Sequence, residues 1–297
     1  MRGQIIDSIF AQMKTNQDVF FLTADMGIGL VEKFEESYPN RFSNVGIAEQ
    51  NLVGMSAGLV NLGFRPFAYT ISNFIIHRCF EQIRNDIGLH NYPITLLGTS
   101  TGFDNAPLGP THHIVDDWGT LKGLPNIDIY CPSSLSYAAK LIEKIIQVGR
   151  PAYIRIPKGA HTEPDSEENM VKLRGESDDV LLVSYGNPAQ LCIEVRKQDP
   201  RISVLVINRL RPLDDLALSE ALDLHKRIIV VEDHFPHSGL FGSLCEFIAT
   251  HPIRGKIESL GPRSYTFEVG TSPEYFYKKY GINVTSILKV INKKDDQ

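Results

Sequence analysis

The chain has 297 residues, of which 42% are hydrophobic and 22% charged, so its size and composition suit a soluble protein of two ordinary domains. Its net charge of -5 argues against binding to nucleic acid or an anionic membrane, and the sequence shows no membrane-spanning run and no signal sequence. The four cysteines have neither metal-ligand spacing nor close pairing, so we expect reduced thiols in a cytoplasmic protein.

Short apolar runs alternate with helical patterns over the first half of the chain. An amphipathic helix is predicted at 4–14, and further helices at 75–89 and 135–148. The apolar runs are typical of strands buried in a parallel sheet and lie at 19–22, 66–71, 94–97, 127–130 and 152–156. This alternation predicts a doubly wound α/β domain over residues 1–160.

A polar stretch separates that domain from a second, smaller alternation. Residues 161–178 are rich in charged side chains and contain Gly and Pro, so we predict a linker. Beyond it the patterns predict strands at 180–183, 203–207 and 227–231, and helices near 188–196, 214–225 and 240–250. The expected fold class is therefore α/β with two doubly wound domains, the second over 179–297.

Residues 44–60 combine one carboxylate with an otherwise uncharged helix. The pattern predicts a strand end, a short turn and a helix with Glu49 near its start. Beyond Asn51 the helix is uncharged, so we expect it to be buried on every side. A helical Gly costs about 1 kcal/mol relative to Ala, so Gly54 and Gly58 suggest that another backbone packs close to them. Glu49 is either a charge placed on the helix dipole or a buried functional acid.

Several common catalytic signatures are missing from the sequence. Gly27-x-Gly29 follows a strand but lacks the third glycine of a dinucleotide fingerprint, so we interpret it as a turn. There is no P-loop, no HxxxH or CxxC metal motif and no G-x-S-x-G elbow. Most nucleotide, metal and serine-hydrolase sites are thereby excluded.

Two segments that follow predicted strands remain as candidates, because ligands of open α/β sheets bind beyond the carboxyl ends of strands. The first, 73–80, gathers aromatic, His and Arg side chains, although core packing alone would explain its two phenylalanines. The second, 98–117, is a long loop with His112 and His113. An exposed pair is the default there, but the rigid Gly-Pro approach favours one histidine pointing into a site.

Four segments follow one another along the chain: Arg41-Phe-Ser-Asn-Val-Gly-Ile-Ala-Glu-Gln50, Glu81-Gln-Ile-Arg-Asn-Asp-Ile-Gly-Leu89, Gly109-Pro-Thr-His112 and Ile154-Arg-Ile-Pro-Lys-Gly159. Their order and spacing resemble those of the transketolase and deoxyxylulose-phosphate synthase family. The segment 230–242 resembles part of the family's C-terminal domain. The resemblance covers essentially the whole chain and implies a pyrimidine-binding domain for thiamine diphosphate, followed by a transketolase C-terminal domain.

The resemblance implies that Glu49 is the acid that hydrogen-bonds the cofactor's aminopyrimidine ring. A buried carboxyl can share its proton with a ring nitrogen, so that the exocyclic amine can take the thiazolium proton and leave the carbanion that attacks a ketose. The other cofactor-binding residues implied are a stacking wall of Phe74, His77 and Phe80, together with Asp25 and Ile47.

Two residues are candidates for contacting substrate. His112 is similar to the family's histidine that faces substrate hydroxyl and carbonyl oxygens, where a donor or proton relay stabilises developing charge. Arg155 could reach an anionic substrate group, and a structural role at the domain edge fits its position equally well.

The chain departs from the family in two ways. The full-length enzymes hold the metal through a preceding domain with a Gly-Asp-Gly motif, which this sequence lacks. The resemblance therefore implies half of a split transketolase, a transferase subunit of the EC 2.2.1 class that moves a two-carbon ketol unit from a ketose to an aldose. It would need a diphosphate-binding partner that holds Mg2+, in an α2β2 assembly, and would self-associate through the helix in 44–60.

The second departure concerns the substrate. Leu108 stands where the family usually has an Asp that reads a sugar hydroxyl, and the phosphate-reading arginine expected near Cys131 is absent. We therefore expect an unusual or modified sugar, with its phosphorylation open.

Two alternatives remain to the transketolase interpretation. The β subunit of a thiamine-dependent 2-oxoacid dehydrogenase has a similar two-domain layout, but Gly-Pro-Thr-His112 and Ile-Ala-Glu-Gln50 favour transketolase. A non-catalytic scaffold or regulatory subunit is the other, and the presence of both Glu49 and His112 argues against it.

Overall fold

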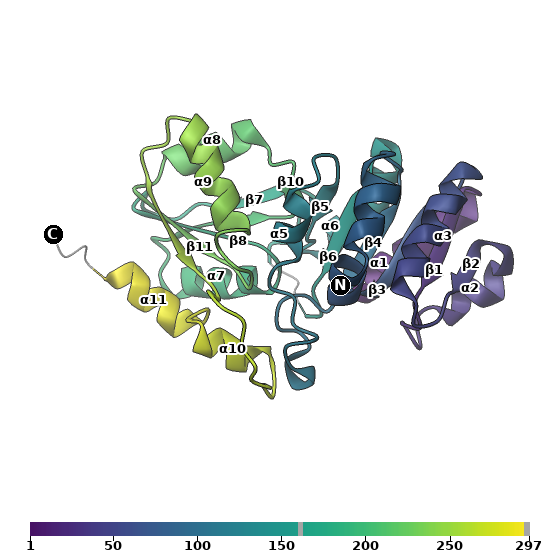
Figure 1. Cartoon of the computed structure of the whole chain (residues 1–297). Coiled ribbons are helices and arrows are strands. Elements are labelled where there is room, and N and C mark those ends of the chain that lie inside the picture. The colour runs from purple at the N-terminus through teal and green to yellow at the C-terminus, as the bar shows by residue number, and fades with distance from the viewer. Residues whose placement is uncertain (160–162, 294–297) are drawn as a thin grey trace.

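The computed structural model describes residues 1–159 and 163–293, which form two α/β units lying side by side (Figure 1). Residue 160, the end of the predicted first domain, and residues 161–162, the start of the predicted linker, lie outside the described residues. Each unit has a largely parallel sheet with helices on both faces. The predicted fold class, two doubly wound α/β domains, is confirmed.

The first sheet has seven strands in the order β10-β5-β6-β4-β3-β1-β2. All neighbours pair in parallel except β10, which runs antiparallel to β5. The strands are β1 (Val19–Thr23), β2 (Phe42–Asn44), β3 (Arg65–Ile71), β4 (Thr95–Thr99), β5 (Asp128–Tyr130), β6 (Ala152–Ile156) and β10 (Arg209–Arg211). The apolar runs predicted as strands in this half of the chain coincide with β1 and β3 to β6.

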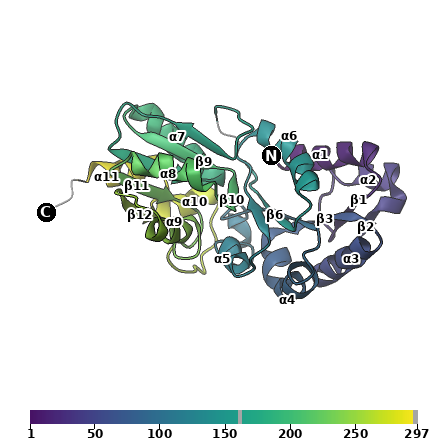
Figure 2. The same ribbon diagram turned by 90° about the horizontal axis from the view of Figure 1, so that it is seen from above.

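Helices cover both faces of this sheet, as Figure 2 shows from above. One face carries α1 (Arg2–Thr15) and α6 (Leu135–Val148), and α2 (Glu32–Ser37) lies near β2. The other face carries α3 (Glu49–Asn61), α4 (Phe80–Gln82) and α5 (Asp117–Lys122). The bounds of α6 follow from its sequence: the Ser134 side chain accepts a hydrogen bond from the Tyr137 N–H at its start, and Gly149 ends it at φ 64°.

The single helix predicted at 75–89 is divided in the structure. A π-helical turn at Phe74–Arg78 leads through Cys79, at φ -109° and ψ 14°, into α4, and a second π-helical turn follows at Ile83–Gly88. Such turns widen the helix and change the direction of its side chains, and they occur often at functional sites. The apolar spacing predicted the helical character but not the interruption.

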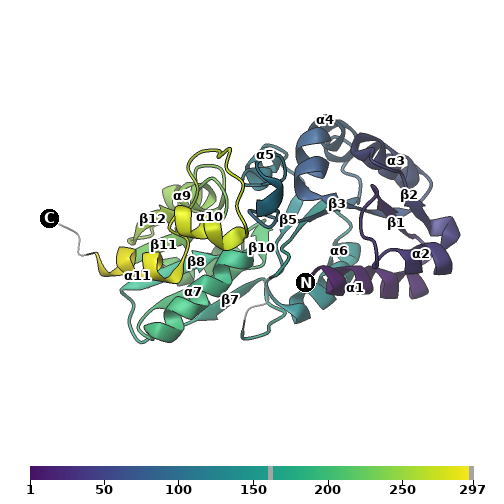
Figure 3. The ribbon, with the colours of Figure 1, turned by 90° about the horizontal axis from the view of Figure 1, so that it is seen from below.

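The second sheet has five strands in the order β12-β11-β8-β9-β7. They are β7 (Met170–Leu173), β8 (Val180–Ser184), β9 (Ser203–Ile207), β11 (Arg227–Val231) and β12 (Lys256–Leu260). Its helices are α7 (Gly186–Gln198), α8 (Asp215–Asp223), α9 (Leu240–Thr250), α10 (Pro273–Lys279) and α11 (Val284–Asn292). Figure 3, seen from below, shows α7, α10 and α11 on one face, while α8 and α9 lie on the other.

Three strands lie where the sequence analysis expected none: β7, β10 and β12, the last of which pairs in parallel with β11 at the edge of the second sheet. β7 falls inside the predicted linker, yet it pairs antiparallel with β9 and completes the second sheet. β10 follows the second sheet's strand β9 in sequence but joins the edge of the first sheet. All three are short and partly exposed, with no continuous apolar run to reveal them. The two units are therefore tied by backbone pairing as well as by side chains.

Helix α3 is buried on one face only. Its buried residues are Glu49, Leu52, Val53 and Ser56. Met55 is 37% exposed, and among the described residues nothing beyond the helix's own backbone lies within 4 Å of a Cβ built at Gly54 or Gly58. The prediction that this helix is buried on every side is wrong for the single chain, because its second apolar face is left uncovered.

Within the described ranges, no helix is both long enough and apolar enough to cross a bilayer.

Candidate functional site

Glu49 is the first residue of α3, directly after the turn that follows β2, and its side chain is 2% exposed. Arg78, from the turn after β3, forms an ion pair with Glu49 Oε2 through Nη1. The Arg78 side chain is 44% exposed, so a half-exposed cation meets a buried carboxylate. The sequence analysis did not single out Arg78, whose place next to His77 was the only available signal.

The Arg78 guanidinium also links Glu49 to the predicted aromatic wall. Its central carbon lies 4.5 Å from the centroid of the Phe74 ring. Phe74 also contacts His112, with ring centroids 5.2 Å apart and planes at 70°. The Asn73 side chain donates a hydrogen bond to the Thr111 carbonyl, which ties the two loops together. Glu49, Arg78, Phe74 and His112 thus form one continuous cluster beyond the carboxyl ends of β2, β3 and β4.

His77 belongs to a second, adjoining group. Its Nε2 lies 2.9 Å from Asp116 Oδ1, and Tyr265 from the second unit donates a hydrogen bond of 2.5 Å to Asp116 Oδ2. Burial lowers the pKa of His77, but the hydrogen bond and charge of Asp116 outweigh it, so the pKa is raised. Burial raises the pKa of Asp116, yet the bonds from His77 and Tyr265 leave it lowered. Asp116 therefore couples the predicted cofactor wall to the second unit.

A cavity of about 490 Å³ between the two units shares Asp116 with this group. From the second unit it is lined by Phe235, His237, Ser238, Arg263, Ser264 and Tyr265. The hydroxyls, imidazole and guanidinium suit a polar or anionic small molecule. Sequence spacing gave no indication of these residues, because they lie more than a hundred positions from Asp116.

Asp25 and Ile47 lie together at the β2 edge of the sheet. The Asn44 side chain accepts hydrogen bonds from the Asp25 and Gly46 N–H groups, each at 3.0 Å. Asp25 has φ 48°, an uncommon conformation for a residue other than Gly, and Ile47 is 78% exposed. Both flank the turn that leads into Glu49, so their proposed contact with the cofactor stays a prediction.

Phe80 and His113 belong to the packing of the protein. Phe80 is half-buried against the core cluster beneath α3, which fits the alternative that it is a core residue. His113 is 8% exposed, with its ring 4.7 Å from that of Phe276 in α10, and burial lowers its pKa. Of the histidine pair, His112 is therefore the one beside the aromatic wall.

Arg155 does not fit the predicted contact with substrate. Its side chain is 0% exposed, with Nε 3.0 Å from Asp117 Oδ2 and Nη1 3.1 Å from Asp233 Oδ1. Its Nη2 donates to the Ile114 carbonyl. A guanidinium enclosed in this way cannot reach a ligand, so the structural alternative replaces the substrate role. Asp233 lies in the second unit, and Arg155 therefore holds the two units together.

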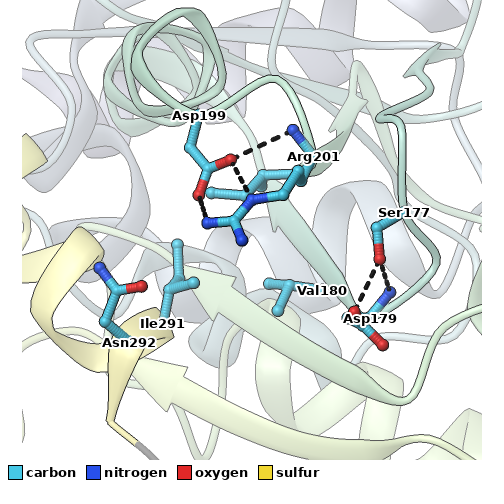
Figure 4. A pocket seen from close by; sticks show the side chains of 8 residues that line it. Ser177, Asp179, Val180, Asp199, Arg201, Ile291 and Asn292 are labelled. Atoms are coloured by element: carbon cyan, nitrogen blue, oxygen red, sulfur yellow. Dashed lines mark hydrogen bonds and ion pairs between the residues drawn. The ribbon is translucent and has the colours of Figure 1, made fainter.

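A further hollow, shown in Figure 4, lies at the amino ends of β8 and β9. It contains an ion pair between Asp199 and Arg201, with two N···O distances of 2.8 and 2.7 Å. None of the predicted site residues lines it, and its charged residues are already paired, Asp199 with Arg201 and Asp179 with Lys226.

The described residues contain no cluster of three or more His, Cys, Asp or Glu side chains that could hold a metal ion. The buried Glu49 carboxyl and the half-buried Phe74 ring do fit an aminopyrimidine, which needs one acid partner and one stacking surface. The arrangement thus suits the organic end of thiamine diphosphate.

Comparison with known families matches residues 4–163 to the transketolase pyrimidine-binding domain and residues 169–287 to the transketolase C-terminal domain. The chain belongs to the transketolase family. It is 28% identical over 294 residues to a subunit of apulose-4-phosphate transketolase of Actinobacillus succinogenes, covering 96% of this chain and 94% of that protein. It is also 26% identical to a putative transketolase C-terminal section of Methanocaldococcus jannaschii, covering 98% of this chain and 95% of that one.

Longer family members align with the chain over part of their length. Identity with the 1-deoxy-D-xylulose-5-phosphate synthase of Dictyoglomus turgidum is 32%, over 94% of this chain and 47% of that protein, so the chain spans about half of that transketolase relative. A solved structure described as a split gene transketolase, an inactive beta4 tetramer, superposes with a TM-score of 0.85 at 26% identity. That alignment covers 98% of this chain and 96% of the other.

Proposed function

We propose that this chain is the half of a split transketolase that holds the pyrimidine end of thiamine diphosphate and, with a partner subunit, transfers a two-carbon ketol unit from a ketose to an aldose in the cytoplasm. The observation that carries this proposal is the continuous cluster of Glu49, Arg78, Phe74 and His112. It joins an acid for the aminopyrimidine, a ring for stacking, and a histidine for the substrate.

The protein side chains have separate tasks in this proposal. Thiamine diphosphate would supply the carbanion chemistry. Glu49 would hold a proton at the pyrimidine ring, and Phe74 with His77 would orient that ring. Arg78 contacts Glu49 Oε2, so a ring nitrogen that shares a proton with Glu49 has to displace this ion pair or approach the other oxygen. His112 would donate to the substrate oxygen on which negative charge develops.

The diphosphate and Mg2+ would be held by a partner subunit. The chain has no Gly-Asp-Gly motif, and its described residues include no cluster of metal-binding side chains. The names of two relatives, one a transketolase subunit and the other a C-terminal section, support a protein made of two kinds of chain. The structural relative described as an inactive beta4 tetramer supports the inference that this half alone does not catalyse. We therefore propose an α2β2 enzyme.

We further propose that the sugar substrate is unusual or modified. Leu108 ends a short 3-10 turn and is 56% exposed on the loop that carries His112. An apolar side chain there cannot accept a hydrogen bond from a sugar hydroxyl, so discrimination in favour of that hydroxyl is lost. The Actinobacillus relative, named for apulose-4-phosphate, supports a sugar other than the common pentoses.

Self-association through α3 would complete the assembly. The helix presents an exposed face with Gly54, Met55 and Gly58, next to Leu62, which is 75% exposed. Small residues one turn apart allow two helices to approach closely, and a two-fold axis would place this face against its own copy.

Gly58→Leu tests this contact, with Gly3→Leu as its matched control. Both glycines are helical, and in the described part of the chain no atom outside the helix's own backbone and the chain neighbours lies within 4 Å of a Cβ built there. We expect sedimentation to show a smaller assembly for Gly58→Leu and no change for Gly3→Leu. An unchanged assembly in both variants would place the contact elsewhere.

The catalytic proposal is tested by co-expressing the chain with a Gly-Asp-Gly-containing partner. The purified complex, with thiamine diphosphate and Mg2+, is assayed for ketol transfer over a panel of ketoses and aldoses and for 2-oxoacid decarboxylation. We expect ketol transfer by the complex and not by the isolated chain. We also expect calorimetry to show that the isolated chain binds the cofactor weakly. Decarboxylation without ketol transfer would instead identify a dehydrogenase subunit, and a stable complex without either activity would identify a scaffold.

A further inference from the structure

The loop between β12 and α10 lies against the loop that carries His112, and together they expose a group of apolar side chains. Every member of the group is at least 44% exposed, and Phe267 is 94% exposed. We define the inter-unit apolar patch as the side chains of Leu108, Tyr265, Phe267, Val269 and Tyr275. Single exposed apolar residues are ordinary on protein surfaces, whereas a contiguous group marks a surface that another molecule covers.

Contacts between the two loops make the patch contiguous. The Gly270 N–H donates a hydrogen bond of 3.1 Å to the Ala106 carbonyl. A Cβ built at Gly109 would lie 3.2 Å from Val269 Cγ2, and one built at Gly270 would lie 3.0 Å from Tyr275 Cδ1. In Figure 1 both loops lie on the lower side of the molecule, beside α10. The patch therefore joins residues of both units in one surface.

The outward position of Phe267 is fixed by its neighbours. Lys279 Nζ, from α10, donates a hydrogen bond of 3.1 Å to the Thr266 hydroxyl. The Tyr275 hydroxyl, also from α10, donates one of 2.7 Å to Glu268. Because successive side chains of an extended chain point to opposite sides, these bonds turn the polar residues toward α10 and the apolar ones toward solvent. The loop thus presents an apolar surface that is ordered before any partner arrives.

The patch borders the candidate site. Leu108 precedes His112 on the same loop, and the Tyr265 hydroxyl bonds Asp116 beside the predicted cofactor wall. A subunit that holds the diphosphate of a cofactor bound at this wall has to cover the adjoining surface. The chain also spans only about half of the Dictyoglomus turgidum relative, so the missing half of such an enzyme needs a surface to pack against.

A second copy of the chain is the other possible occupant. Self-association, however, is already assigned to the exposed face of α3 with Gly54 and Gly58. Helix α3 covers a face of the first sheet, whereas the patch belongs to loops that connect the two units. The position beside the candidate site therefore favours the diphosphate-binding subunit.

We propose that the inter-unit apolar patch is a docking surface for the diphosphate-binding partner subunit, with the Phe267 ring buried against apolar side chains of that subunit. The only hydroxyls of the patch, on Tyr265 and Tyr275, already donate to carboxylates, so an apolar partner surface fits it and a charged one does not. This inference rests on the proposed function, because it requires such a subunit.

The test measures the affinity between the full chain and the Gly-Asp-Gly-containing subunit by calorimetry. Phe267→Asp places a charge between Tyr265 and Val269 and should weaken the complex about thirtyfold or more, the loss typical of a central interface residue. The matched control is Leu216→Asp, because Leu216 is an 82% exposed apolar residue on α8 of the same unit. It should leave the affinity unchanged, and circular dichroism confirms that both variants are folded.

Hydrogen exchange provides a second measurement on the wild-type protein. Backbone amides of residues 264–277 should exchange more slowly in the complex than in the isolated chain, because a covered loop opens less often. The amides of α8 should exchange at the same rate in both.

The possible outcomes separate this inference from the proposed function. Wild-type affinity in Phe267→Asp, or unchanged exchange at 264–277 in a stable complex, would overturn the docking surface and leave the proposed function standing. A wild-type chain that binds no such subunit would overturn both. A Phe267→Asp chain that binds the subunit normally but self-associates less would assign the patch to a second copy and overturn the inference.

Discussion

Two arginine–carboxylate contacts in this protein have similar chemistry and different surroundings. Arg78 meets Glu49 at the strand ends of the first sheet, with side chains 44% and 2% exposed. Arg155 meets Asp117 and Asp233 between the two units, and all three side chains are 0% exposed. In the first pair the cation can turn into solvent and uncover the carboxylate. In the second group every charge is enclosed.

This difference in burial distinguishes a candidate ligand site from a structural ion-pair network. The Glu49 carboxylate can exchange the half-exposed Arg78 for a ligand. The fully buried group of Arg155, Asp117 and Asp233 cannot contact a ligand, so it can only connect the elements that carry its members. Removing one member of a buried group leaves an uncompensated charge, and breaking such a group costs about 3–5 kcal/mol. We therefore expect substitutions at Glu49 to affect activity, and substitutions at Arg155 to affect stability.

The largest expected effect is that of Glu49→Ala on catalysis. Proton transfer by a positioned side chain typically contributes a factor of about 10²–10⁴, so turnover of the partner complex should fall by that factor. Folding and assembly should be retained, because Arg78 is half-exposed and can be solvated when its partner is removed. Steady-state kinetics and sedimentation of the complex measure the two effects, with the exposed Glu35→Ala as control. Turnover at the wild-type rate would refute the catalytic role.

Whereas Glu49→Ala should reduce turnover, Arg155→Met should reduce the stability of the protein. It leaves Asp117 and Asp233 buried without a cation, so the free energy of unfolding should fall by about 3–5 kcal/mol in urea titrations. The matched control is Arg201→Met, which removes a two-point contact with Asp199 from a side chain that is 68% exposed. Exposed pairs contribute little to stability because water and salt screen them, so this control should change the free energy of unfolding only slightly. Equal losses in both variants would mean that burial does not distinguish the two arginines.

Sequence patterns predicted the parts of this fold that depend on local order. Continuous apolar runs identified the inner strands, and the uncharged helix with an acid at its start identified α3 and Glu49. The edge strands β7, β10 and β12 were missed, since short, half-exposed strands carry no continuous apolar signal. The divided helix at 74–88 was missed because apolar spacing does not encode a π-helical turn.

The site was predictable only as far as family motifs name its residues. The family motifs predict roles for Glu49, Phe74 and His112, and these roles stay predictions. The contacts of Arg78 and Tyr265 depend on which elements meet in space. The same limit left both roles of Arg155 open in the sequence, because the sequence marks it as a charge at a strand end and only the structure shows the two carboxylates that enclose it.

The dependence of stability on pH tests whether His77 and Asp116, beside the predicted cofactor wall, form an ion pair in solution. The raised pKa of His77 means that its contribution to stability is complete below its ordinary value of 6.5 and is lost as pH rises through the folded value. The lowered pKa of Asp116 means that its contribution is present above 3.8 and is lost as pH falls. The pair should therefore stabilise most between about pH 4 and 6.5.

Asp116→Asn should lower the pKa of His77, because burial, which opposes the charged form, then acts without the carboxylate. NMR titration of the imidazole measures the shift, and Asp86→Asn, which changes another acid near the same segment, is the control. A His77 pKa that is the same in Asp116→Asn and wild type would show that the 2.9 Å contact does not form in solution.

The smallest expected effect belongs to Tyr265→Phe, which removes the second unit's hydrogen bond to Asp116. The Tyr265 side chain is 68% exposed, so water can replace the lost donor and the free energy of unfolding should change by less than about 1 kcal/mol. The bond nevertheless lowers the pKa of Asp116, so its removal should raise that pKa, measurable by carbonyl NMR titration. Tyr275→Phe breaks a similar bond, to Glu268 at 2.7 Å, entirely within the second unit and should leave Asp116 unchanged. If Tyr265→Phe also leaves the pKa of Asp116 unchanged, this hydrogen bond does not form in solution and does not couple Asp116 to the second unit.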